Sequence, residues 1–135
     1  MPRYLLDTNA FSFALRPVSA EFDRRFEQTD LADVAVSVIT QAELLFGLAR
    51  RPLAHTLAST VHTLLGKISV LPWTSECAAN YATIRSDLEL RGKPMSVMDM
   101  MIAAHALAEN AVLVTHDAAF RRINHLRIED WTQPL

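Results

Sequence analysis

The sequence predicts an α/β fold, a three-layer α/β/α domain built around a central parallel sheet of four to five strands. Short apolar runs alternate along the chain with longer segments in which apolar residues recur at helical spacing. The runs are apolar at nearly every position, as at residues 34–38, which is typical of strands covered by helices on both faces. The length of 135 residues fits one domain over residues 1–135.

The first third of the chain is predicted to hold two strands and three helices. Residues 3–7 form a buried strand that ends on an acid, and a short helix follows at 8–15. Ser19 caps the second helix, which carries two phenylalanines on one face. Residues 34–38 form the second strand, and a helix at 40–49 follows it.

The middle third continues the alternation. Pro52 suits the first turn of a helix that ends at Gly66, because proline lacks the N–H that a first turn leaves unused. Residues 68–71 form the third strand. Thr74 then caps a long helix that reaches about residue 90.

The last third completes the sheet. Ser96 begins an alanine-rich helix that runs to about residue 110, and the fourth strand follows at 111–115. A short helix follows Asp117, and residues 126–129 form a candidate edge strand. In parallel sheets of this kind, ligands bind beyond the carboxyl ends of the strands, where the strand order reverses.

Composition excludes several classes of protein. Lys and Arg number 13 against 15 Asp and Glu, so binding that relies on bulk positive charge is excluded. The single cysteine, Cys77, excludes an internal disulfide and a Cys-rich zinc site. Asp7 interrupts the first apolar residues before a signal peptide could form, and no apolar run approaches the ~18 residues of a membrane span. We therefore expect a cytoplasmic protein without a membrane partner.

Four carboxylates stand at element boundaries. Asp7 ends the first strand, and Glu43 lies near the start of the helix that follows the second strand. Asp99 lies near the start of the alanine-rich helix, and Asp117 lies where the short helix after the fourth strand begins. Acids at helix starts are commonly caps, since they complement the helix dipole. The pairs Thr40 with Glu43 and Ser96 with Asp99 have the spacing of a capping box, so a local role stays open for them. For Asp7 a functional role is favoured over a purely structural one, because a charged side chain at the end of a buried strand loses its hydration and needs a partner.

Together the four acids indicate a metal site. Carboxylates that converge on one rim repel one another, and a divalent cation relieves that repulsion. Ligation by oxygen alone favours Mg²⁺ or Mn²⁺ over zinc. Such a site suits metal-assisted hydrolysis of a phosphodiester. Two alternatives remain at this point: a phosphatase or phosphoacceptor domain, and a non-catalytic binding module.

The order and spacing of several segments resemble the PIN-domain ribonucleases, and among them the VapC toxins of bacterial toxin–antitoxin pairs. The resemblance covers nearly the whole chain. It rests on LDTN at 6–9, SVITQAEL at 37–44, DMMIAAHA at 99–106 and LVTHD at 113–117, with Phe120 and EDW at 129–131.

The resemblance implies a compact PIN-like α/β/α domain that uses Mg²⁺ or Mn²⁺ to cleave single-stranded RNA. Among close relatives the substrate is a tRNA cut in its anticodon loop, which inhibits translation. It also implies a cognate antitoxin protein as partner and a homodimer. Basic residues that are candidates for steering the RNA backbone are the pairs Arg24 and Arg25, Arg50 and Arg51, and Arg121 and Arg122, with Arg91 and Lys93.

Carried over by position, Asp7, Glu43, Asp99 and Asp117 match the catalytic acids of that family. Asp7, Asp99 and Asp117 are the expected metal ligands, while Glu43 positions or deprotonates the attacking water. Thr8, Asn9 and Thr115 match small polar residues that orient the carboxylates. His105 lies off the face of Asp99, and we expect it to be a packed structural histidine.

Overall fold

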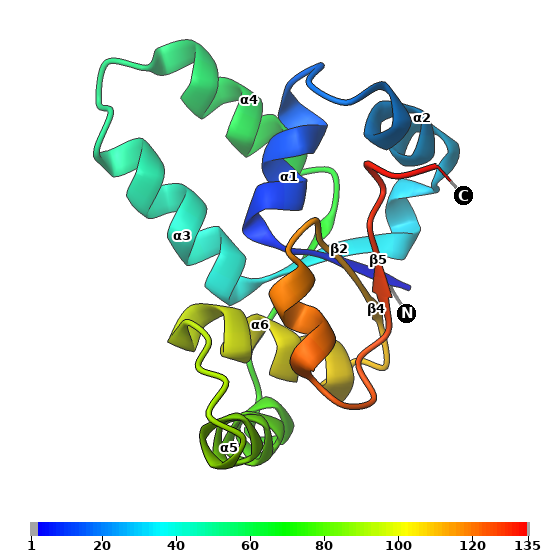
Figure 1. The fold of residues 1–135 in the computed structure, drawn as a ribbon. Helices are drawn as coiled ribbons and strands as arrows, with labels where there is room; N and C mark the ends of the chain where they lie inside the picture. The colour runs from blue at the N-terminus through cyan, green and yellow to red at the C-terminus, as the bar shows by residue number, and fades with distance from the viewer. Residues whose placement is uncertain (1–2, 135) are drawn as a thin grey trace.

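Five strands form one sheet in the computed structural model, which describes residues 3–134. In chain order the strands are β1 (Tyr4–Leu6), β2 (Val34–Ser37), β3 (Ser69–Leu71), β4 (Val112–Val114) and β5 (Ile128–Glu129). They lie in the order β3-β2-β1-β4-β5, and every neighbouring pair is parallel (Figure 1). The predicted α/β fold with a parallel sheet is confirmed.

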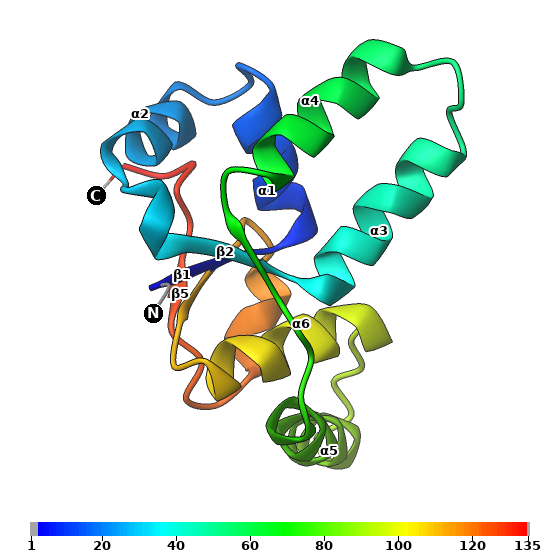
Figure 2. The same ribbon diagram turned by 180° about the vertical axis from the view of Figure 1, so that it is seen from behind.

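Helices cover both faces of the sheet. They are α1 (Thr8–Leu15), α2 (Ala20–Gln28), α3 (Val38–Ala49), α4 (His55–Leu65), α5 (Ser75–Leu90) and α6 (Val97–Ala108), with 3₁₀ helices η1 (Leu31–Asp33) and η2 (Ala118–Arg122). Figures 1 and 2 show α5 and α6 below the sheet and α1, α2 and α4 above it. Across residues 3–134, no helix is long and apolar enough to cross a membrane.

Two apolar cores follow from the alternation of side chains along the strands. Leu5 of β1 and Leu113 of β4 pack with α5 and α6, whereas the next residue of β1, Leu6, packs with α1 and α2. Helices cover both faces of the inner strands β1, β2 and β4, which explains their near-continuous apolar sequences, whereas the edge strands β3 and β5 are partly exposed.

The strand order places the site. Sequence neighbours β1 and β2 pair on one side of β1, while β4 pairs on its other side, so the order reverses between β1 and β4. Leu6 lies opposite Val114 in the register of that pair. The residues that follow, Asp7 and Thr115, therefore emerge side by side at the point where such sheets bind ligands.

Two predicted helix starts are wrong. Helix α3 begins at Val38, because the Ser37 hydroxyl accepts the Ile39 N–H at 3.0 Å and caps the helix earlier than Thr40. Thr40 is buried inside α3, so the capping box predicted for Thr40 and Glu43 does not form.

Helix α4 begins at His55 instead of near Pro52, which lies in a turn of the α3–α4 connection. The sequence prediction also omitted η1, whose first turn is capped by Asp30 through the Ala32 N–H at 3.0 Å. The short helix predicted after Asp117 exists as the 3₁₀ helix η2.

Candidate active site

Asp7 is the buried centre of the site. It caps α1, because its Oδ1 accepts the Ala10 N–H at 2.7 Å, and its Oδ2 accepts the Thr115 hydroxyl at 2.5 Å. The residue is only 4% exposed, and this burial raises the pKa of Asp7 from 3.8 to about 6. The two hydrogen bonds oppose the rise, and the charges of Asp99 and Asp117 add to it.

Asp99 and Asp117 lie close enough to Asp7 for their charges to raise its pKa. Asp99 lies in the first turn of α6, where its N–H donates to the Ser96 hydroxyl at 3.1 Å. Burial raises the pKa of Asp99, the Ser96 hydroxyl opposes the rise, and the charge of Asp117 adds to it. Asp117 is exposed and caps η2 through the Ala119 N–H at 2.8 Å. The fold thus brings these three acids to one edge of the sheet.

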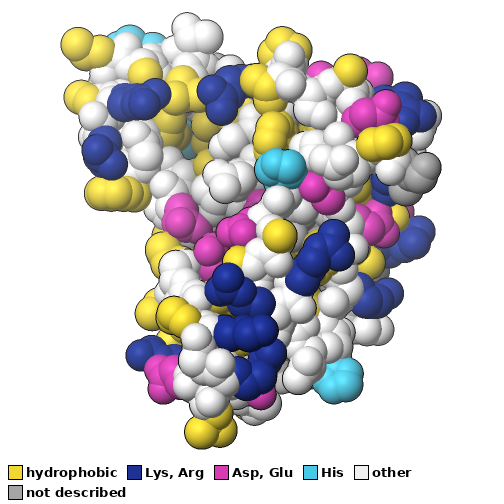
Figure 3. Space-filling view, viewed as in Figure 1, with side chains coloured by type: hydrophobic (Ala, Val, Ile, Leu, Met, Phe, Trp, Pro, Cys, Tyr) yellow, Lys and Arg dark blue, Asp and Glu magenta, His cyan; other side chains and the backbone are white. Residues whose placement is uncertain are grey.

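Glu43 joins the group through a threonine. It lies in the second turn of α3, and its Oε1 accepts the Thr8 hydroxyl at 2.6 Å. Thr8 directly follows Asp7 in the chain, so this hydrogen bond ties Glu43 of α3 to the start of α1. Figure 3 shows acidic side chains gathered near the middle of one face of the molecule.

The small polar residues predicted around the acids differ in their contacts. Thr8 and Thr115 each donate a hydroxyl hydrogen to a carboxylate, at 2.6 and 2.5 Å. The Thr115 oxygen also accepts the Asp117 N–H at 3.0 Å, so one threonine contacts two of the acids. Asn9 is exposed and lines a hollow together with Asp117.

The donor set suits a hard cation, since carboxylate and hydroxyl oxygens are the ligands that Mg²⁺ and Mn²⁺ prefer. Within residues 3–134, no three His, Cys, Asp or Glu side chains stand close enough together to form a ready-made metal site. Mg²⁺ needs only one or two carboxylates, because it keeps several waters.

Residues 4–126 match the family described as PIN domain. The chain belongs to the PIN domain family. It is 29% identical over 133 residues to the tRNA(fMet)-specific endonuclease VapC of Shigella flexneri, which covers 98% of this chain and 100% of that relative. It is 31% identical over 130 residues to ribonuclease VapC2 of Rickettsia felis, with 95% and 97% covered.

Solved structures agree with these matches. DNA-bound VapBC from Salmonella typhimurium superposes with a TM-score of 0.89 at 30% identity, over 97% of this chain and 99% of that chain. VapBC2 from Rickettsia felis, bound to a promoter DNA fragment, gives 0.84 at 31% identity, over 93% and 96%. These matches confirm the resemblance of this PIN domain to the VapC proteins, and none of these relatives is a phosphatase or phosphoacceptor domain.

His105 of this PIN domain lies in the core. Its Nδ1 stands 2.7 Å from the Ser37 hydroxyl, and the side chain is fully buried. Burial lowers the pKa of His105, so the ring is neutral near pH 7. The pair joins the start of α3, which carries Glu43, to α6, which carries Asp99. The sequence analysis missed Ser37, although a serine at the end of a strand is itself a cap signal.

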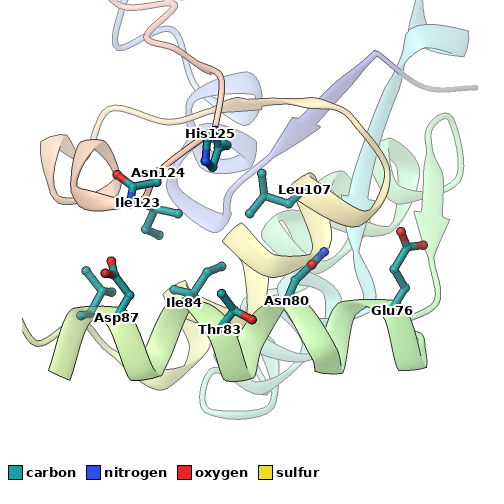
Figure 4. Close-up of a pocket in the computed structure, with 10 residues that line it drawn as sticks. Glu76, Asn80, Thr83, Ile84, Asp87, Leu107, Ile123, Asn124 and His125 are labelled. Carbon is teal, nitrogen blue, oxygen red and sulfur yellow. The ribbon is translucent and has the colours of Figure 1, made fainter. Parts of the chain in front are cut away.

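The PIN domain has a larger hollow elsewhere, of about 510 Å³ (Figure 4). It lies between α5 and the segment that leads from η2 to β5, with Asn80 and Ile84 on one side and Ile123 and His125 on the other. None of the four candidate acids lines it. Size alone therefore does not identify the active site of this molecule.

Proposed function

We propose that the chain is a Mg²⁺- or Mn²⁺-dependent endoribonuclease toxin that hydrolyses single-stranded RNA in the cytoplasm. The observation that carries the proposal is the placement of Asp7, Asp99 and Asp117 at the strand-order reversal, within electrostatic reach of one another. Membership of the PIN domain family supports the same chemistry.

Asp7, Asp99 and Asp117 would hold the cation, which supplies positive charge to the scissile phosphate and acidifies water. Glu43 positions the attacking water and accepts its proton, and the Thr8 hydroxyl fixes the carboxylate for that task. Thr115 fixes Asp7 and the Asp117 backbone together, so that the carboxylates keep their relative positions.

Surface charge supports a nucleic-acid substrate despite the net charge of −2. Figure 3 shows Lys and Arg side chains gathered below the acidic group. Arg91 donates to the Arg122 carbonyl oxygen, and Arg122 donates to the Pro94 carbonyl oxygen at 3.1 Å, so these two arginines lie together at the 92–95 loop. Phosphates next to the cut would meet positive charge on this side.

The finer assignment of the substrate is a tRNA, cut in its anticodon loop, with inhibition of translation as the consequence. It rests on the Shigella flexneri relative, which is named a tRNA(fMet)-specific endonuclease. Unpaired loops also suit single-strand specificity, because their bases are accessible. Sequencing the 5′ ends of RNA after a pulse of expression tests this assignment, and cuts confined to messenger RNA would contradict it.

We also propose a cognate antitoxin and a homodimer as assemblies of this chain. Solved neighbours are VapBC complexes. Leu45 and Phe46 on α3 and Leu53 in the α3–α4 connection are exposed, and such apolar side chains favour a protein partner. Light scattering of the chain alone, and then with the antitoxin, tests both assemblies. A chain that stays monomeric and does not bind the antitoxin would refute them.

The decisive test of the function is cleavage of RNA by the purified protein with Mg²⁺ or Mn²⁺. EDTA should stop the reaction, and Asp99→Asn should abolish it without unfolding the protein. Asp23→Asn is the matched control, because Asp23 also lies in the first turn of a helix but on α2, outside the acidic group. Full activity of Asp99→Asn, or equal loss in both variants, would refute the assigned role.

A further inference from the structure

A hollow of about 350 Å³ opens beside the acidic group, between α1 and the loop from β4 to η2. Asp117 belongs both to the acidic group and to its wall. The wall comprises Asn9, Ser12, Phe13, Arg16, His116 and Asp117. A ligand in this hollow would therefore contact Asp117 and lie beside the acidic group.

The wall combines two rings with hydrogen-bonding groups. The Phe13 and His116 rings meet edge to face, with their centroids 6.1 Å apart and their planes at 86°. Asn9 adds an amide, Ser12 a hydroxyl and Arg16 an exposed guanidinium. Aromatic faces that stack on a base, together with groups that bond its edge, are how proteins hold unpaired RNA bases.

Contacts with neighbouring side chains hold the Phe13 and His116 rings in place. His116 Nδ1 lies 2.9 Å from Asp130 Oδ2 and 3.1 Å from the Thr132 hydroxyl. Phe13 packs against Phe22 of the core, at 5.6 Å between centroids. The wall is therefore ordered before a ligand arrives, which lowers the entropic cost of binding.

We propose that this hollow is a subsite for one base of single-stranded RNA, the base that flanks the scissile phosphate; the proposal rests on the proposed ribonuclease function. The Asn9 amide and the Ser12 hydroxyl offer donors and acceptors to a base edge, beside the two rings that can stack on its face. The volume lies at the small end of ligand sites, which span about 300–1,000 Å³, and suits a single base.

The test compares Phe13→Leu with Phe26→Leu. Both replace a ring that contacts Phe22, but only Phe13 lines the hollow. Each protein digests an RNA pool of random sequence, and sequencing of the new ends gives the base preference around the cut. Wild type and Phe26→Leu should show a preference at one flanking position that is about tenfold weaker in Phe13→Leu, because a base that has lost its stack of about 1–3 kcal/mol is no longer held with its edge against Asn9 and Ser12.

An unchanged base preference in Phe13→Leu, with wild type cleaving normally, would overturn the subsite and leave the ribonuclease function intact. The subsite is also wrong if Phe13→Leu loses only its affinity for the antitoxin, since the hollow would then hold a protein.

If wild type cleaves no RNA, the proposed function fails, and a binding experiment tests the subsite instead. Fluorescence anisotropy then compares an intact RNA 8-mer with the same 8-mers carrying one abasic position each. An abasic penalty in wild type and Phe26→Leu that is absent from Phe13→Leu supports the subsite, and equal binding throughout overturns it.

Discussion

Asp7→Asn should abolish cleavage and at the same time stabilise the metal-free protein. Burial raises the pKa of Asp7 from 3.8 to about 6 in the folded state. A group whose folded pKa is raised contributes stability below its unfolded pKa, and that contribution is lost as pH rises through the folded pKa. Above about pH 6 the folded protein therefore carries an ionised carboxylate that it disfavours, and the neutral amide removes it.

The size of the effect follows from the same pKa values. A change from 3.8 to about 6 corresponds to about 3 kcal/mol at pH 7.5, since one pKa unit equals 1.36 kcal/mol. This figure is an upper limit, because Asn in place of Asp7 keeps only one carbonyl oxygen for the bonds from Ala10 and Thr115. Asn caps a helix as well as Asp, so α1 should persist. The melting temperature should rise by up to roughly 10 °C.

Denaturant unfolding between pH 4 and pH 8 in EDTA measures this difference directly. The advantage of Asp7→Asn should be small near pH 4 and grow as pH rises through about 6. Asp130→Asn is a control of opposite sign. The hydrogen bonds of Asp130 with Thr132 and His116 outweigh its burial and lower its pKa, so its carboxylate stabilises the fold. A variant Asp7→Asn that is less stable than wild type at pH 7.5, or equally favoured at every pH, would refute the reasoning.

Three further predictions concern the surroundings of Asp7. Ser37→Ala should destabilise the fold by about 1–3 kcal/mol in urea unfolding, because it removes the α3 cap and the hydrogen-bond partner of the buried His105 ring. Thr40→Val is the control and should not destabilise the fold, since the buried Thr40 hydroxyl has no partner within residues 3–134. Glu43→Gln should lower kcat about 10²-fold or more with little change in KM, and Thr8→Val should lower kcat by a smaller factor. Single-turnover kinetics measure both variants, and an unchanged rate in Glu43→Gln would contradict the role of Glu43. Mg²⁺ should raise the melting temperature of wild type but not of Asp99→Asn, and an equal rise in both would show that the cation binds elsewhere.

Most of the fold could be predicted because parallel strands that are buried on both faces leave a clear apolar signal. Residues 34–36 and 112–114 are fully or nearly fully buried, and short apolar runs of this kind are typical of strands in a parallel sheet covered on both faces. Helix starts were harder to predict. Ser37 and Thr40 both carry a hydroxyl that can cap α3, and only the strand register shows that the chain turns at Ser37.

The contacts of the site could be predicted only in part. Thr8 and Thr115 were expected to orient carboxylates, and each donates to one. The contact between Ser37 and His105 spans 68 positions, and that between Asp130 and His116 depends on the path of the chain after β5. Local sequence patterns carry no information about pairs of this kind, because tertiary packing decides them.

Capping and catalysis are not competing roles for these acids. Asp7 caps α1 after β1, and Asp117 caps η2 after β4, so each acid satisfies the N–H groups of the element that starts where its strand ends. Because β1 and β4 are parallel neighbours, their caps must emerge at the same edge of the sheet. The topology thus turns separate local caps into one cluster of acids; burial raises the pKa of Asp7 and Asp99, and the neighbouring charges add to the rise. A cation bound there would relieve a strain that the fold itself creates.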